Sequence, residues 1–158
     1  MDIKDTVKLS NRVTVEHRNA AGDLLYQNEG DNLVVNGGFD WLCAQIGGTA
    51  LAASCNFIGV CADTGAVGAT DSSLTSEYDD DDGLDRVAAD YAHTPGTKVF
   101  TLSTTFIKGA GANKVAGKTG LFDQQAVGGT MLAAYLIPTP PTLAPTDTLL
   151  VTWTITLS

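Results

Sequence analysis

The sequence is poor in charged residues, and the charge that it carries is mostly acidic. Charged residues make up 17% of the 158 positions, with nine basic and 18 acidic residues and a net charge of -9. Lysine and arginine form no cluster anywhere in the chain, whereas binding to phosphate backbones needs a basic surface. We therefore expect no nucleic-acid partner.

Residues that bind transition metals or act as nucleophiles are also scarce. The two histidines, His17 and His93, and the three cysteines, Cys43, Cys55 and Cys61, match no zinc-site spacing. Neither G-x-S-x-G nor H-E-x-x-H occurs. We therefore predict no enzyme activity, no catalytic residue and no cofactor. The cysteines are interpreted as buried free thiols, with one disulfide as the alternative, and His17 as a packed core or interface histidine.

Long apolar runs and aromatic residues are few. No stretch approaches the about 20 apolar residues of a membrane span, and the first residues lack the apolar segment of a secretory signal. We expect no membrane partner and no export by the usual route. Aromatic residues make up 7% of the chain, which is little for a carbohydrate-binding cleft.

Alternating apolar and polar residues are the clearest positive signal, above all in residues 148–158. Leu149, Val151, Trp153, Ile155 and Leu157 share one face, while Thr152, Thr154 and Thr156 share the other. This period of two predicts a strand. Its apolar face is expected to close the core, and its threonine face to meet solvent or a neighbouring subunit.

Further strands and a single helix follow from the same kind of pattern. The predicted strands cover residues 7–18, 24–27, 56–61, 98–107, 113–122 and 131–137. Residues 37–46 predict a short α-helix, because Phe39, Leu42, Cys43 and Ile46 recur at helical spacing. A helix this short must pack on a sheet. The chain is therefore predicted to be mainly β, a single domain over 1–158 with an antiparallel β-sandwich or jelly-roll-like fold.

Two segments interrupt the strand pattern: a long loop excursion over 62–97 and a Pro-rich connector over 138–146. Loops this long in a compact domain are usually functional. Within the first segment lies an acidic run, the four consecutive aspartates at 79–82. The run is interpreted as a solvated loop, and a calcium site formed by Asp79, Asp81, Asp82 and Asp85 is the alternative.

Six short segments occur in order from residue 32 nearly to the end of the chain. They are Asn-Leu-Val-Val-Asn-Gly-Gly-Phe (32–39), Phe-Ile-Gly-Val-Cys-Ala-Asp-Thr-Gly (57–65), Leu-Thr-Ser-Glu (74–77) followed by Arg86, Thr-Gly-Leu-Phe-Asp (119–123), Gly-Gly-Thr-Met-Leu-Ala (128–133) and Asp-Thr-Leu-Leu-Val-Thr-Trp-Thr-Ile-Thr (147–156). Together they resemble a family of small virion proteins of tailed bacteriophages, comprising head decoration (cement) and tail-fibre-associated β proteins.

The resemblance implies a non-enzymatic capsid decoration protein that binds the major capsid protein across subunits and stabilises the phage head. It further implies a homotrimer on the head surface of the virion, synthesised in the host cytoplasm. A tail-fibre or baseplate component that contacts the host is the alternative, and a virion hydrolase or sugar-binding module is a third reading. The interface candidates are Tyr78, Arg86, Tyr91, Thr152, Thr154 and Thr156.

The sequence departs from the expected family pattern at two places. The acidic run lengthens the loop between Glu77 and Arg86, which leaves a pairing of these two residues open. Lys118 stands where such proteins commonly carry an acid, which removes a possible ion pair.

Overall fold

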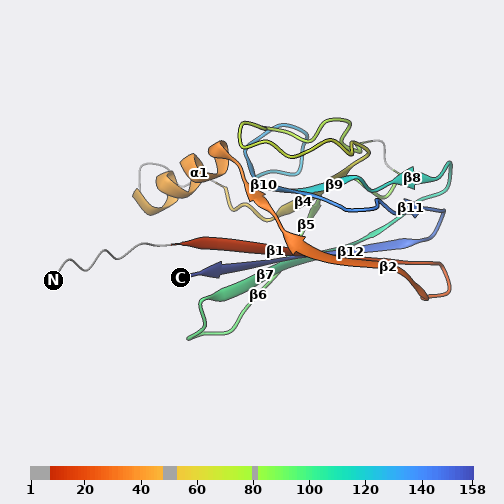
Figure 1. Cartoon of the computed structure of the whole chain (residues 1–158), viewed down its shortest axis with the longest axis horizontal. Coiled ribbons are helices and arrows are strands. Elements are labelled where there is room, and N and C mark those ends of the chain that lie inside the picture. The colour runs from red at the N-terminus through yellow and green to blue at the C-terminus, as the bar shows by residue number, and fades with distance from the viewer. Residues whose placement is uncertain (1–7, 48–52, 80–81) are drawn as a thin grey trace.

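The computed structural model describes residues 8–47, 53–79 and 82–158, which fold into two five-stranded antiparallel sheets, one two-stranded sheet and one helix (Figure 1). The first sheet contains β1 (Leu9–Arg18), β2 (Leu24–Asp31), β6 (Asp90–His93), β7 (Val99–Ile107) and β12 (Thr148–Leu157). The second contains β3 (Leu33–Val34), β4 (Phe57–Cys61), β5 (Val87–Ala88), β9 (Lys118–Phe122) and β10 (Met131–Leu136). β8 (Lys114–Val115) pairs with β11 (Thr142–Leu143), and α1 spans Asn36–Gly47.

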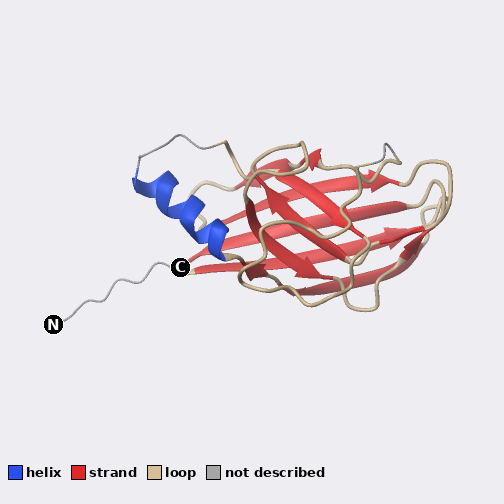
Figure 2. Ribbon diagram, turned by 90° about the horizontal axis from the view of Figure 1, so that it is seen from above, coloured by secondary structure: helices blue, strands red, loops and turns tan. Residues whose placement is uncertain are grey.

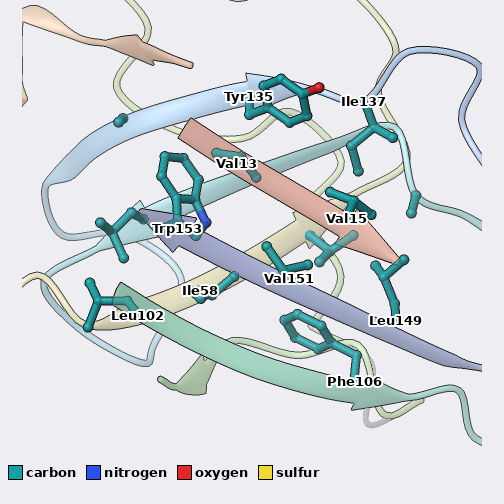
Figure 3. Packing of buried hydrophobic residues seen from close by; sticks show 14 of the residues in the cluster. Val13, Val15, Ile58, Leu102, Phe106, Tyr135, Ile137, Leu149, Val151 and Trp153 are labelled. Carbon is teal, nitrogen blue, oxygen red and sulfur yellow. The ribbon is translucent and has the colours of Figure 1, made fainter. Parts of the chain in front are cut away.

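Strand order places the first and last strands, β1 and β12, in the interior of the first sheet. The order is β2-β1-β12-β7-β6 in the first sheet and β3-β10-β9-β4-β5 in the second. The two sheets pack face to face, and one hydrophobic cluster draws residues from both (Figure 3). The predicted mainly-β antiparallel fold with one short helix is confirmed.

The terminal strand β12 lies at the centre of the first sheet, between β1 and β7. Trp153 is opposite Val13 on β1 and Leu102 on β7, and all three side chains are buried. Its other inward residues are buried as well, except Leu157 at the end of the strand, which is 43% exposed. The predicted apolar face of β12 therefore closes the core, as Figure 3 shows.

The second sheet is covered on both faces. All five residues of β9 and five of the six in β10 are buried. The inner face meets the first sheet, while a second cluster that includes Leu74 and Phe122 covers the outer face. Part of the predicted loop excursion 62–97 therefore belongs to the core.

Three predicted segments differ in detail from the structure. The excursion 62–97 contains the short strands β5 and β6, and the connector 138–146 contains β11. Both residues of β5 and all four of β6 are exposed, so these strands have no buried face to impose apolar alternation. The predicted strand 113–122 is divided into β8 and β9 at Ala116–Gly117, where the amide of Gly117 bonds the carbonyl of Cys61 instead (2.8 Å).

Candidate interaction surface

Three of the four residues in the predicted apolar stripe of α1 face solvent. Phe39 is 51% exposed, Ile46 is 83% exposed and Cys43 is exposed. Gly38 is the one fully buried residue of the helix. The helix does pack on the sandwich, through Trp41 and Leu42, but the predicted apolar stripe is corrected for Phe39, Cys43 and Ile46, which are exposed. We call these three residues the docking stripe, because they lie within about 60° of one another around the helix axis.

Other residues of α1 attach the helix to the sandwich. Trp41 and Leu42 pack against the main core cluster, and the Trp41 indole N–H donates to the carbonyl of Ala53 (3.2 Å). The first turn approaches β10 very closely, since a Cβ built on Gly38 would lie 2.1 Å from the carbonyl oxygen of Leu132. Only glycine fits there. This contact fixes the orientation of the helix and directs the docking stripe outward.

A groove with apolar residues in its lining adjoins the docking stripe at Phe39. Leu33 on β3 is 38% exposed, and together with Leu9, Val34 and Phe39 it lines a groove of about 400 Å³. Figure 2 shows that α1 projects from one end of the sandwich, beside the C-terminal end of β12. Exposed large apolar side chains that gather at one place mark interaction surfaces on soluble proteins.

The threonine face of β12 lies on the outside of the first sheet. Thr152, Thr154 and Thr156 are half-buried by neighbouring strands. Arg12, opposite Thr154, forms an exposed ion pair with Glu29 on β2 (2.6 Å). This face is polar and accessible, so the three threonines stay predicted interface residues.

Arg86 is a different case, because its side chain is only 1% exposed. It bonds both carboxylate oxygens of Glu77, whose side chain is 3% exposed, and its guanidinium lies 3.4 Å from the centroid of the Phe122 ring. It also donates to the carbonyls of Gln124, Ala126 and Gly128 (3.2, 2.8 and 2.8 Å). Arg86 is therefore no surface contact, and its assignment as an interface residue is corrected.

Glu77 and Arg86 do pair, although the acidic run lies between them in the sequence. The guanidinium of Arg86 holds the 123–130 loop by its carbonyl groups. Gly59 on β4 lies directly beneath, since a Cβ there would lie 2.6 Å from the Glu77 carboxylate. The pair thus fixes two loops over the outer face of the second sheet.

The two tyrosine candidates differ in their surroundings. Tyr78 is half-buried, and its hydroxyl donates to the carbonyl of Val115 (2.9 Å). Tyr91 on β6 is 63% exposed and packs against Phe100 with ring centroids 5.6 Å apart. Tyr91 is thus the more accessible of the two.

The acidic run is partly structural rather than wholly solvated. Asp82 lies 2.6 Å from the ammonium group of Lys108, whose side chain is fully buried. This pair ties the loop to the residue that follows β7. Asp81 lies outside the described residues, and within the described part of the chain no three His, Cys, Asp or Glu residues gather as metal ligands. The predicted calcium set is not assembled there.

Lys118 also forms an ion pair that its position did not predict. Its ammonium group lies 2.5 Å from a carboxylate oxygen of Asp63. The hydrogen bond from Lys118 holds the pKa of Asp63 below its usual value. Lys118 is therefore paired, with Asp63 as its partner.

The three cysteines are free, but only two are buried. Burial raises the pKa of Cys55 to about 12 and that of Cys61 to about 11. The predicted buried thiols are confirmed for Cys55 and Cys61. Cys43, in contrast, lies in the docking stripe, because the helix face that carries it turns outward.

This difference predicts selective thiol chemistry. Because alkylation requires an accessible thiolate, a maleimide at neutral pH should label Cys43 alone in the native chain. Mass spectrometry of the intact protein should show one adduct, and three after denaturation. A Cys43→Ser variant should then show none in the native state. Native labelling of Cys55 or Cys61 would contradict the burial described above.

A buried hydrogen bond that no sequence motif predicts joins β1 to the turn before β12. His17 is 4% exposed, as predicted for a packed histidine, and its Nε2 lies 2.8 Å from a carboxylate oxygen of Asp147. The same oxygen accepts the amide of Ala144 (2.9 Å). Desolvation by itself raises the pKa of Asp147, but the hydrogen bonds from His17 and Ala144 outweigh it and the pKa is lowered.

A pH dependence follows from the lowered pKa of Asp147. Its stabilising contribution is present above the unfolded-state pKa of about 4 and is lost as pH falls through the folded pKa. An Asp147→Asn variant should therefore melt below the wild type at pH 7. The gap between the two melting temperatures should narrow from pH 6 to pH 3. A gap that stays constant over this range would contradict the assignment, and Asp23→Asn on an exposed turn serves as the control.

Comparisons with known proteins add no assignment. No family model, no curated protein and no solved structure matches the chain. No helix in the described residues is long and apolar enough to cross a membrane.

Proposed function

We propose that this chain is a non-enzymatic structural protein of a tailed-bacteriophage virion, a decoration (cement) protein that binds the major capsid protein. The observation that carries the proposal is the docking stripe. An apolar helix face held away from its own core by the Gly38 contact needs another surface to cover it. The ordered series of segments over residues 32–156, which resembles phage virion proteins, supports the same proposal.

The rest of the fold suits a rigid accessory module. Buried ion pairs at Glu77–Arg86 and Asp82–Lys108 hold the loops, together with the buried hydrogen bond between His17 and Asp147. Binding would then cost little loop ordering. In this proposal the chain stabilises the head by adding buried area where capsid subunits meet. A homotrimer would place one docking stripe on each of three neighbouring subunits.

A tail-fibre or baseplate component is the alternative, favoured by one observation. Tyr91 is exposed on a short edge strand, away from the docking stripe, and is suited to contact with a host surface. Only the distribution of the chain on the particle separates the two proposals.

The test is to count and locate the chain on purified virions. Quantitative mass spectrometry and antibody labelling in electron micrographs should find several hundred copies distributed over the head. A few copies at one vertex would favour the tail component. Absence from purified particles would overturn both proposals, as would a monomeric chain that cleaves polysaccharide.

A further inference from the structure

A cavity of about 410 Å³ lies between α1 and the β6–β7 edge of the first sheet. Its walls include Trp41 and Gln45 from α1, Ser54 and Asn56 from the segment before β4, and Tyr91 and Phe100 from β6 and β7. This volume falls within the about 300–1,000 Å³ of small-molecule sites. Trp41 and Gln45 lie on the opposite side of α1 from the docking stripe, so the two surfaces are separate.

Three aromatic rings form the apolar part of the cavity. The indole of Trp41 is held by its hydrogen bond to Ala53 (3.2 Å), and the rings of Tyr91 and Phe100 are tilted by 41° to one another. Tyr91 is 63% exposed, so much of its ring is available to a ligand. The amino-acid composition does not predict this cluster, because a low total of aromatic residues does not show which of them lie close together in the fold.

Uncharged polar groups complete the lining. Within the described part of the chain, the hydroxyl of Ser54 and the carboxamide of Asn56 make no hydrogen bond. The backbone of Asn56 is nevertheless fixed. Its backbone N–H donates to the backbone carbonyl of Ser54 (3.0 Å), and its backbone carbonyl accepts from the N–H of Ala89 (2.7 Å). Among the described residues, no Asp, Glu, Lys or Arg lines the cavity, and the Cys55 thiol in its wall stays protonated at neutral pH.

We propose that this cavity binds a neutral saccharide. The C–H face of a pyranose ring packs on the faces of aromatic rings, because these faces carry a partial negative charge that attracts the weakly positive hydrogens. Its hydroxyl groups would pair with the carboxamide of Asn56 and the hydroxyl of Ser54. A purely apolar ligand would bury those groups unpaired, and a charged ligand would find no counter-charge. This binding activity goes beyond the proposed structural role and does not depend on it.

The experiment uses the full chain in solution without particles. The chain is screened on an array of neutral glycans, and binders are titrated by ligand-observed NMR as their methyl glycosides. We expect saturable binding of at least one neutral glycan. Tyr91→Ala and Asn56→Ala should each weaken it roughly tenfold. Ile107→Ala, a change at an exposed position outside the cavity lining, should leave it unchanged.

Each other outcome overturns the proposal. These outcomes are no binding to any neutral glycan, preference for a charged glycan or for an apolar probe such as cyclohexanol, and binding that survives both cavity substitutions. Circular dichroism of each variant separates loss of binding from loss of fold. Because particles are absent, failure here leaves the decoration proposal untouched, and failure of decoration leaves this result intact.

Discussion

Replacing Arg86 by methionine should destabilise the fold more than any surface substitution. The change leaves the Glu77 carboxylate, whose side chain is 3% exposed, without its cation. It also removes the donor from the carbonyls of Gln124, Ala126 and Gly128. Breaking a buried pair in this way costs about 3–5 kcal/mol. For a chain of this size the melting temperature should fall by roughly 10 °C.

Chemical denaturation of two further variants tests whether the loss of stability comes from breaking the buried ion pair. Arg12→Met breaks an exposed ion pair, with side chains 60% and 49% exposed, and should cost less than about 1 kcal/mol. Glu77→Met combined with Arg86→Met removes the stranded charge and should recover part of the loss. An Arg86→Met variant as stable as Arg12→Met would show that this pair does not hold the loops.

Placing charge on the docking stripe should abolish binding to the particle without unfolding the chain. Ile46 and Phe39 are 83% and 51% exposed, so Ile46→Asp and Phe39→Asp remove little from the core. If each side chain is central to the contact, each change costs at least about 2 kcal/mol of binding, or roughly 30-fold in affinity. The double variant should show no detectable binding.

The assay is cosedimentation of purified chain with particles from which the chain has been removed. Val127→Asp, at an exposed apolar position on the 123–130 loop, is the matched control and should bind like the wild type. Analytical ultracentrifugation of each variant reports its self-association separately. Normal binding by the double variant, or loss of self-association alone, would place the particle contact elsewhere.

The exposure of the docking stripe could not be predicted from the sequence. Helical spacing predicts which residues of α1 share a face, but it cannot say whether that face is covered. That outcome depends on the close approach of Gly38 to Leu132, a contact between positions far apart in the chain. In β12 the alternation was sufficient, because the first sheet packs on the core with one face and leaves the other accessible.

The buried ion pairs could not be predicted from the sequence either. Lys108 and Lys118 follow or lie within apolar strands, and their partners Asp82 and Asp63 come from distant loops. No local pattern predicts such pairs. The pairing of Glu77 with Arg86 was visible only as a question raised by a resemblance, and the cavity beside Trp41 combines segments that no single motif contains.

The most direct test of the docking stripe is the alkylation rate of Cys43 on free and particle-bound chain. Cys43 lies between Phe39 and Ile46 on the exposed face of α1, and the other two thiols are buried. If the stripe is the contact surface, Cys43 should react readily in the free chain, be protected on the particle and react again after release. Equal rates on the particle and in solution would contradict the account.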